Sequence, residues 1–427
     1  MLYLDLTARN DWSSTLNPDN RSYFYPSVGG SWLFTETLKK SNSLPDFLNY
    51  GKLRLSYAQV GNDASPYQLY DYYTVRLPLE NGVANLNPTK SDTKALYDLK
   101  NETVNSYELG LELKAFQNRL GLDFAYYNKE AKNQILKMNT PSSTGFSYKY
   151  VNAGNVRNRG IEILLTGTPV QSKDLTWDVS LNFSKNSNKI VELAEGITQQ
   201  VLSDPSYNGL LKIVAEEGGS YGDFYGKGYM RHENGQILIG ADGLPIIDSD
   251  EKKLGNGNPK WMAGITNSLR YRDFDFSFQI DMRYGGNVYM GSMRSGAAAG
   301  TLKMTEAGRE SMTVPGVLAD GTPNNITTTA EKYYGVLSGI SEAWIYDATN
   351  VRLRELSVGY KLPRKLLSKT FIQSAKISFV GRNLWMIYSK TDGFDPEAGF
   401  STGNAQGFEY GAMPTMRSLG FNINVTF

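Results

Sequence analysis

The sequence predicts an all-β protein, folded as a transmembrane antiparallel β-barrel. Its 427 residues include 28 Tyr, 18 Phe and 42 Gly, a composition that favours strands and turns over helices. Apolar and polar residues alternate along many segments, which is the period of a strand with two unlike faces. Short and long connections alternate between those segments. Because no stretch approaches the roughly 18 consecutive apolar residues of a membrane helix, a membrane crossing must use strands.

Charge and residue usage argue against several classes of function. The 44 Lys and Arg residues balance 43 Asp and Glu residues, so no basic field predicts a nucleic-acid partner. The chain has no cysteine, which rules out thiol catalysis, disulfides and thiolate metal sites. Its single histidine, His232, stands beside Glu233 in a long connection. A Ser, His and acid arrangement stays open, since such groups meet only in three dimensions. We interpret His232 as a solvated residue and predict that the protein is not an enzyme.

The predicted strands start at the N-terminus, where Leu2, Leu4 and Leu6 face away from Tyr3 and Asp5. Alternation over about ten residues, the length of a tilted strand that crosses a bilayer, recurs along the chain. Clear examples are the segments 107–114, 120–127, 175–184, 273–283 and 418–427. In all, the pattern predicts about twelve strands. They begin near Leu2, Ser27, Lys52, Asn105, Arg119, Arg159, Asp174, Lys260, Asp273, Asn350, Ser374 and Met416.

One predicted strand breaks the alternation. In NVRLRELSVGYKLP the apolar positions change from odd to even numbers between Val351 and Leu356. A β-bulge near Arg354 and Glu355 would absorb the extra residue. Arg352 and Arg354 would then face the barrel lumen, because an arginine at mid-membrane depth on the lipid face costs about 2 to 4 kcal/mol.

Short connections are predicted at one end of the sheet and long connections at the other. Tight turns near Gln117, Pro169, Arg272 and Pro363 alternate with long loops. The long loops are predicted at 61–102, 135–156, 186–259, 285–349 and 389–414. An outer-membrane barrel has long extracellular loops and short periplasmic turns, whereas a soluble sandwich has no physical reason for this sorting. The last strand then runs toward the short-turn side, and Phe427 is expected at the periplasmic interface.

Four tryptophans, Trp177, Trp261, Trp344 and Trp385, lie near predicted strand ends. They fit the aromatic girdle of a membrane barrel and fit ordinary core positions equally well.

Several long motifs resemble one known family. They are VNAGNVRNRGIEILLTGTPV, LGNGNPKWMAGITNSLRYRDFDFSFQIDMRYGGNVYMG, DATNVRLRELSVGYKLP, GRNLWMIYSKTDGFDPEAG and MRSLGFNINVTF. In this order, and over essentially the whole chain, they resemble the C-terminal barrel of the SusC/RagA family of TonB-dependent outer-membrane transporters. The resemblance implies that residues 1–427 supply about 12 C-terminal strands of a barrel of roughly 22, with no separate soluble domain.

The same resemblance implies that a plug domain, a TonB-contacting segment and further strands precede this chain. Met1 is therefore expected to be an internal cut or an added initiator. The cost of open edges agrees with a missing half: about ten unpaired backbone groups in hydrocarbon would cost several kcal/mol each.

The resemblance also implies a function: TonB-dependent active import of a large nutrient, an oligosaccharide or a peptide, across the outer membrane. The implied partners are a SusD-like surface lipoprotein as an extracellular lid, the TonB complex acting through the missing N-terminal part, the barrel assembly machinery and the lipid membrane. The alternative from another class is a passive diffusion barrel or an outer-membrane assembly scaffold, closed by twelve strands.

Candidate binding residues lie in long loops rich in Tyr, Asn, Asp and Gly. Aromatic faces stack on sugar rings and planar groups. The candidates are Tyr67, Tyr70, Tyr72, Tyr207, Tyr333 and Tyr334. The resemblance implies that Phe421 and Phe427 belong to an assembly signal.

No cofactor is predicted. Asp242, Asp248 and Asp250 offer oxygen ligands for calcium, but their segment lacks the glycine and the distal glutamate of an EF-hand loop. We interpret the segment as a solvated acidic loop, with calcium as the alternative. FDPEAG, with Asp395 and Glu397, is interpreted as an ordered turn.

Overall fold

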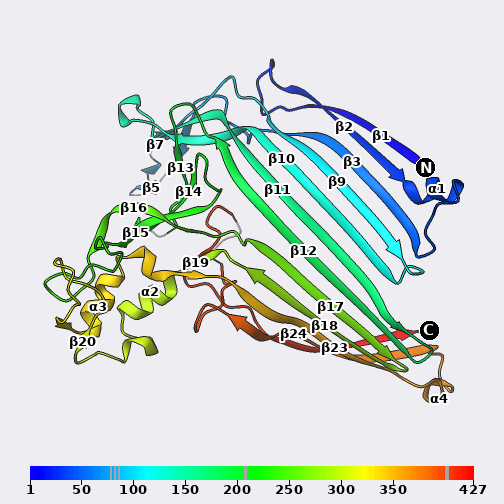
Figure 1. Ribbon diagram of the computed structural model, residues 1–427. Coiled ribbons are helices and arrows are strands. Elements are labelled where there is room, and N and C mark those ends of the chain that lie inside the picture. The colour runs from blue at the N-terminus through cyan, green and yellow to red at the C-terminus, as the bar shows by residue number, and fades with distance from the viewer. Residues whose placement is uncertain (77–78, 81–82, 85–86, 206–208, 400–402) are drawn as a thin grey trace. The chain divides into compact units, whose positions relative to one another are not determined.

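A computed structural model of the chain describes residues 1–76, 79–80, 83–84, 87–205, 209–399 and 403–427 (Figure 1). The chain divides into two compact units. The first comprises Met1–Ile163, Asn186–Gln200 and Glu216–Gly219, and the second comprises Leu164–Lys185, Val201–Ala215 and Ser220–Phe427. The long strands β11 and β12 each contribute residues to both units.

The first unit is a sheet of long strands that neighbour one another in chain order. Its strands are β1 (Leu2–Trp12), β2 (Ser22–Leu33), β3 (Leu48–Asn62), β9 (Glu102–Ala115), β10 (Leu120–Asn139) and β11 (Tyr148–Gln171). Its shorter elements are α1 (Phe34–Lys40), β4 (Tyr73–Arg76), β5 (Leu79–Glu80), β6 (Val83–Ala84), β7 (Asn87–Lys90), β8 (Thr93–Lys94) and η1 (Ser142–Thr144).

The second unit is also built on long strands that neighbour one another in chain order, and each pair of neighbours is antiparallel. Its long strands are β12 (Leu175–Glu192), β17 (Trp261–Tyr271), β18 (Phe274–Tyr284), β23 (Asn350–Lys361), β24 (Ser374–Ser389) and β26 (Ser418–Thr426). Its connections carry β13 (Gln199–Ser203), β14 (Leu211–Glu216), β15 (Asp223–Tyr229), β16 (Ile247–Asn256), β19 (Asn287–Met290), β20 (Met312–Thr313), β21 (Thr327–Thr328), β22 (Ile345–Asp347) and β25 (Phe408–Glu409). The helices are α2 (Gly291–Ala298), η2 (Lys303–Thr305), α3 (Ala330–Leu337), η3 (Ser341–Trp344) and α4 (Arg364–Leu367).

The predicted strands are confirmed, since the main path of paired strands contains the twelve elements expected from alternation. The largest error concerns the loop predicted at 135–156. There β10 and β11 extend well past their alternating segments, so that only residues 140–147 connect them. Backbone pairing continues where the side chains no longer alternate, and side-chain period alone therefore underestimates strand length.

Period-two alternation gives the long strands of both units one apolar face that is open to its surroundings. Leu419 and Phe421 of β26 are 63% and 79% exposed. The opposite face carries charge: Asp275 of β18 pairs with Lys376 at 2.5 Å and Arg270 at 3.1 Å. Exposed apolar rows of this extent are uncommon on soluble proteins and suit contact with lipid chains.

The long connections of the second unit fold into a compact core of their own. Phe224, Tyr289 and Phe408 are at most 2% exposed there, and the rings of Tyr289 and Phe408 stack at 5.4 Å. Trp344 is also buried, and its indole N–H donates to the carbonyl of Leu337 at 2.8 Å. Trp344 therefore occupies a core position and is not part of an aromatic girdle.

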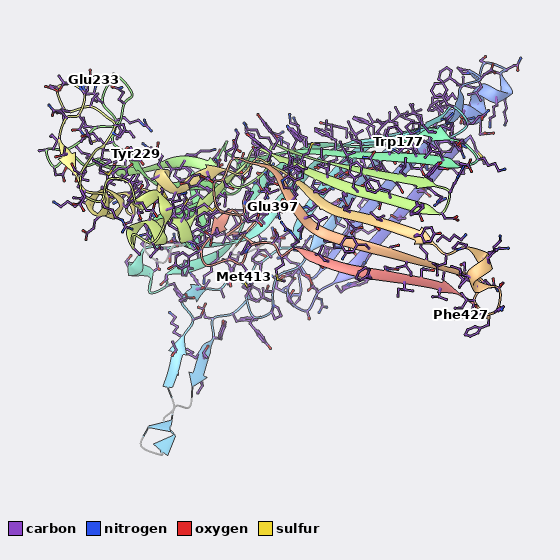
Figure 2. The ribbon with its side chains drawn as sticks, turned by 90° about the horizontal axis from the view of Figure 1, so that it is seen from below. Trp177, Tyr229, Glu233, Glu397, Met413 and Phe427 are labelled. Atoms are coloured by element: carbon purple, nitrogen blue, oxygen red, sulfur yellow. The ribbon has the colours of Figure 1, made fainter. Side chains whose placement is uncertain are left out.

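The predicted sorting of connection lengths holds only in part, because residues 140–147, at an end where a long loop was expected, form a shorter connection than residues 362–373 at the other end. The short connections are 116–119, 172–174, 272–273 and 362–373. In the second unit, Phe427 lies at the same end of the strands as the last two of these, and Glu397 lies at the other end (Figure 2). None of the helices in the described part of the chain is long and apolar enough to cross a membrane.

Candidate functional site

The site begins at a β-bulge in β23. In its pairing with β18, Glu355 lies opposite Gln279 and Leu353 opposite Ile280, so Arg354 is the extra residue. The bulge predicted from the change of parity is thus confirmed. It allows Arg352 and Arg354 to share the polar face of the sheet while the apolar residues on both sides of the bulge keep the other face.

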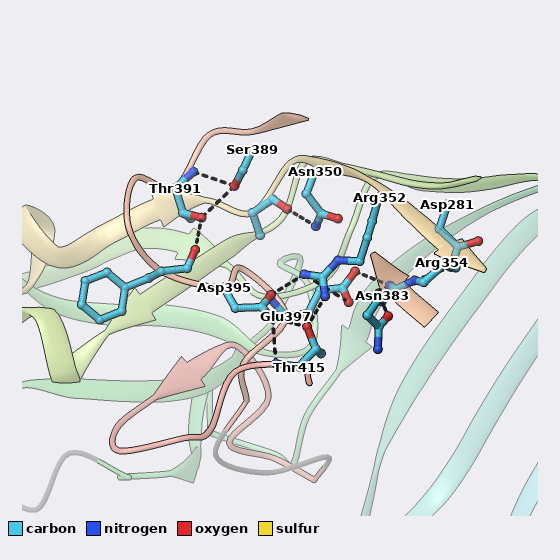
Figure 3. A network of polar contacts seen from close by, with 12 residues as sticks. Asp281, Asn350, Arg352, Arg354, Asn383, Ser389, Thr391, Asp395, Glu397 and Thr415 are labelled. Atoms are coloured by element: carbon cyan, nitrogen blue, oxygen red, sulfur yellow. Dashed lines mark hydrogen bonds and ion pairs between the residues drawn. The ribbon is translucent and has the colours of Figure 1, made fainter. Parts of the chain in front are cut away.

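Arg352 is the buried centre of a polar network (Figure 3). Its side chain is 4% exposed, and Nη2 donates to Oδ1 of Asp395 at 2.6 Å. Its Nη1 contacts the hydroxyl of Thr415. The backbone N–H and the hydroxyl of Thr415 donate to Oδ2 of Asp395 at 3.0 and 2.5 Å. The carboxylate of Asp395 thereby binds both Arg352 on β23 and Thr415 in the connection after β24.

Arg354 extends the network toward neighbouring strands (Figure 3). Its Nε donates to Oδ2 of Asp281 at 2.7 Å, and its Nη2 lies 2.6 Å from both carboxylate oxygens of Glu397. Asn383, which has a φ of 51°, accepts from Nη1 at 3.4 Å and donates to the carbonyl of Met416 at 3.1 Å. These contacts hold both ends of the connection after β24 against the polar face.

The electrostatics of the network keep Asp395 ionised. Burial by itself raises the pKa of a carboxyl group, because it disfavours the charge. The hydrogen bonds from Arg352 and Thr415 outweigh that effect and lower the pKa of Asp395 to about 2. FDPEAG is therefore more than the ordered turn that was predicted, since its two acids anchor the network.

A cavity of about 550 Å³ lies beside the network. It is lined by Arg283, Asn287, Val288, Ala348, Pro396, Glu397, Ala398, Gly399, Gln406 and Gly407. Arg283, at the end of β18, donates from Nη2 to the carbonyl of Gly257 at 3.1 Å, while its buried Nε has no hydrogen-bond partner among the described residues. Gly407 has a φ of 84°, and a Cβ there would lie 2.6 Å from the ring of Phe224, so this wall requires glycine.

Three of the predicted tyrosines lie in the first unit. Tyr67, Tyr70 and Tyr72 are 85%, 64% and 51% exposed, and the ring of Tyr70 lies 5.5 Å from that of Tyr97. Tyr207 lies outside the residues that the structure describes. The surface tyrosines are thus accessible to a ligand, and their role in binding stays a prediction.

The other two predicted tyrosines, Tyr333 and Tyr334, lie on α3 with ring centroids 5.1 Å apart. Tyr334 is 8% exposed, and its hydroxyl donates to the carbonyl of Met304 at 2.9 Å. Tyr334 also lines a cavity of about 380 Å³ together with Arg309 and Glu331, and its role in binding stays a prediction. None of the described tyrosine candidates lines the 550 Å³ cavity.

The three calcium candidates are engaged locally, and the carboxylate of Asp250 accepts from the hydroxyl of Ser249 at 3.5 Å. Asp242 accepts from the backbone N–H of Leu244 at 3.1 Å, and Asp248 accepts from that of Asp250 at 3.2 Å and pairs with Lys252 at 3.2 Å. Across the described ranges, no group of three His, Cys, Asp or Glu side chains is placed to hold a metal ion.

The assembly candidates Phe421 and Phe427 lie in and directly after the last strand. Phe427 is 68% exposed, and its ring stacks on that of Phe371 at 5.5 Å. Phe421 is 79% exposed and lies edge-on to Phe379 at 5.7 Å.

Sequence reasoning missed Arg283, Asn287 and Gln406 as site residues. A usable signal was present: Arg283 is a cation on the polar face of a predicted membrane strand, directly before the YGGN turn. Gln406 carries no comparable signal, because only the fold of the connection after β24 brings it to the cavity.

Comparison with known proteins identifies the family. Residues 1–384 match the family described as TonB dependent receptor-like, beta-barrel. The chain is 30% identical over 453 residues to TonB-dependent receptor P3 of Formosa agariphila, covering 99% of this chain and 43% of that protein. It is 25% identical over 417 residues to TonB-dependent receptor SusC of Bacteroides thetaiotaomicron, covering 92% of this chain and 39% of that protein.

A solved structure of the RagAB peptide transporter superimposes with a TM-score of 0.76 at 22% identity, covering 100% of this chain and 46% of that one. The chain thus spans less than half the length of the relatives it matches. The family comprises transport proteins and not enzymes, in agreement with the expectation from residue usage. On this match, the chain belongs to the β-barrel family of the TonB-dependent receptors and is SusC/RagA-like.

Proposed function

We propose that the protein to which this chain contributes imports a large nutrient across the outer membrane, with energy supplied through TonB. The observation that carries this proposal is the match of residues 1–384 to the receptor barrel family. The exposed apolar rows support a place in a membrane, because residues such as Phe421 would otherwise face water. The chain would supply the C-terminal part of the barrel and its long connections, with Phe427 on the periplasmic side.

The cargo is an oligosaccharide or a peptide. The RagAB barrel, which shares this fold, belongs to a protein described as a peptide transporter and gives a precedent for that class. The exposed tyrosines of the first unit, Tyr67, Tyr70 and Tyr72, offer stacking surfaces to either class.

We assign the polar network a supporting role in this function. Arg352 and Arg354 attach the connection after β24 to the strands through Asp395 and Glu397. A connection held in this way keeps the walls of the 550 Å³ cavity in place while other loops bind cargo.

Deletion of the gene for the full-length receptor tests the function and the cargo class together. The deletion strain would be grown on defined oligosaccharides and on defined peptides as the only source of carbon. Growth should fail on one class and return when the gene is restored. Unchanged growth on both classes would contradict nutrient import by this receptor.

The proposed extracellular partner is a SusD-like surface lipoprotein seated over the long connections. TonB would act through a part of the protein outside this sequence. Purification of the tagged full-length receptor in mild detergent should recover a lipoprotein at a stoichiometry near one to one. Recovery of the receptor alone under several detergents would speak against a stable lid.

A further inference from the structure

We propose that the short connection between β23 and β24, residues 362–373, binds the head groups of anionic phospholipids. Its cations would hold the phosphate groups, and two exposed apolar side chains beside them would enter the acyl region. We call residues 362–373 the basic connection. This inference rests on the proposed function, which puts the short-connection end of the second unit on the periplasmic side of an outer membrane, and it adds a lipid partner.

The first argument is the charge of the basic connection. Arg364, Lys365 and Lys369 are its three cations, and it has no acidic residue. All three residues are exposed, and across the described ranges none of them makes an ion pair. Cations in this state attract the phosphate groups of anionic lipids.

The other short connections of the second unit carry no such excess. Residues 172–174 hold one cation and one acid, Lys173 and Asp174, and residues 272–273 hold Arg272 and Asp273. Asp174 is moreover paired with Arg272 at 3.6 Å. Even with the terminal carboxylate of Phe427 counted, cations are therefore in excess at this end of the strands, and the basic connection supplies that excess.

The second argument is the apolar surface beside the cations. Leu366 and Phe371 are 69% and 79% exposed, whereas Leu367, the last residue of α4, is buried and anchors the helix. The ring of Phe371 stacks on that of Phe427 at 5.5 Å, with their planes 17° apart. Exposed apolar side chains next to cations are typical of a segment at a membrane interface. A soluble phosphate would leave Leu366 and Phe371 in water.

The third argument is that the basic connection is ordered at both ends. The backbone N–H of Leu362 donates to the carbonyl of Ala375 at 2.9 Å. That of Gln373 donates to the carbonyl of Thr426, on β26, at 2.8 Å. A surface held in this way loses little conformational freedom when a lipid binds, so more of the attraction contributes to affinity.

The fourth argument is continuity with the apolar face of the strands. β24 pairs with β26, whose Leu419 and Phe421 are 63% and 79% exposed. Phe427 follows β26 directly, and α4 lies beside this end of the chain (Figures 1 and 2). A membrane that covers the apolar face would therefore present its head groups to the basic connection. On the periplasmic side of an outer membrane, those head groups belong to phospholipids.

The test measures the lipids that the purified full-length receptor retains in native mass spectrometry. The receptor, in detergent, would be titrated with dioleoyl phosphatidylglycerol, which is anionic. The second probe is dioleoyl phosphatidylethanolamine, which has the same chains and no net charge. Lipid A is the third probe, because its phosphate groups belong to the opposite leaflet. The first two probes isolate the head-group charge, and the third identifies the leaflet.

The receptor would be compared with three variants. In the test variant the cations of the basic connection become glutamine: Arg364→Gln, Lys365→Gln and Lys369→Gln. The matched control removes three exposed cations of the long connections, which make no ion pair in the described part of the chain: Lys227→Gln, Lys303→Gln and Lys332→Gln. Leu366→Ser removes an apolar contact and keeps the charge. Heat-modifiable migration on gels checks that each variant is a folded barrel.

We expect the unaltered receptor to bind phosphatidylglycerol about tenfold or more tightly than phosphatidylethanolamine. The test variant should lose most of this preference, the control should keep it, and Leu366→Ser should weaken the retention of both lipids.

Equal retention of the two lipids by the unaltered receptor, a preference that persists in the test variant, or an equal loss in the control would overturn the inference. Tighter retention of lipid A through the same three cations would overturn it as well, and unchanged retention in Leu366→Ser would overturn its apolar part. Because the assay contains neither cargo nor TonB, these outcomes are separate from a failure of energy-dependent import.

Discussion

Arg352 and Asp395 form a buried ion pair, with side chains 4% and 8% exposed. Asp395→Asn would leave the buried arginine with only Glu397, 3.9 Å from its Nη2, as a carboxylate partner, and breaking a buried pair in this way costs about 3 kcal/mol. We expect the backbone amides of Glu397 and Thr415, which donate to Asp395, to exchange with deuterium about a hundredfold or more faster. Asp392→Asn, an exposed position in the same connection, is the control and should change neither rate. Unchanged protection in Asp395→Asn would mean that the ion pair does not hold this connection.

The same carboxyl predicts a dependence on pH. Its pKa is lowered from 3.8 to about 2, so the ionised form is the one that the fold stabilises. This contribution of about 2 kcal/mol is complete above about pH 4 and is lost as the pH falls toward 2. Hydrogen exchange at Thr415, corrected for the intrinsic rate, should therefore speed up over that interval. In Asp395→Asn this pH dependence should vanish, and its persistence there would assign it to another group.

At the scale of the strand, the bulge at Arg354 sets the register of β23. Deletion of Arg354 would turn Val351 and Leu353 to the polar face, because a shift of one residue exchanges the two faces of a strand. Arg354→Ala keeps the chain length and removes only the side-chain contacts. The deletion should abolish surface display of the full-length receptor in an antibody assay, while the alanine variant retains most of it. Equal loss of display in both variants would show that the side chain matters and not the extra residue, and normal display of the deletion variant would contradict the role of the bulge.

The last strand provides a second test at this scale, since we propose that β26 and Phe427 act as an assembly signal. Phe427→Ala should slow assembly of the full-length receptor and leave ligand affinity intact in the molecules that fold. Phe371→Ala removes the ring that stacks on Phe427 but keeps the terminal aromatic, and is expected to assemble normally. A pulse-chase assay of the heat-modifiable form compares the two. If both variants assemble equally slowly, packing and not a signal explains the effect.

The strands could be predicted from sequence because their information is local. Alternation places Leu419, Phe421 and Ile423 on one face whatever the rest of the chain does. The shift of apolar residues from odd to even positions around Arg354 likewise predicts the bulge, which the structure shows in the pairing of β23 with β18. The site was harder to predict, because Arg352 and Asp395 are separated by 43 positions and meet only through the fold of the connection after β24.

On the scale of the whole molecule, the fold of the long connections could not be predicted from the sequence. Those of the second unit form a core around Phe224, Tyr289 and Trp344, and they supply walls for the cavity. Their folds depend on contacts between distant segments, for which one sequence has no periodic signal. The loop tyrosines, by contrast, were chosen because their loops are rich in Tyr, Asn, Asp and Gly. Composition identifies such residues, but it does not show which of them lie close together in the folded protein.

We propose that this chain belongs to a barrel that imports its cargo by consuming energy. Uptake of a labelled cargo, chosen from the growth experiment, should be measured in cells that carry the full-length receptor, with and without a protonophore and in a strain that lacks TonB. We predict that uptake falls to the level of receptor-deficient cells in both cases, while cargo still binds at the cell surface. Uptake that continues at an undiminished rate without TonB or a proton gradient would contradict the account and identify a passive diffusion barrel.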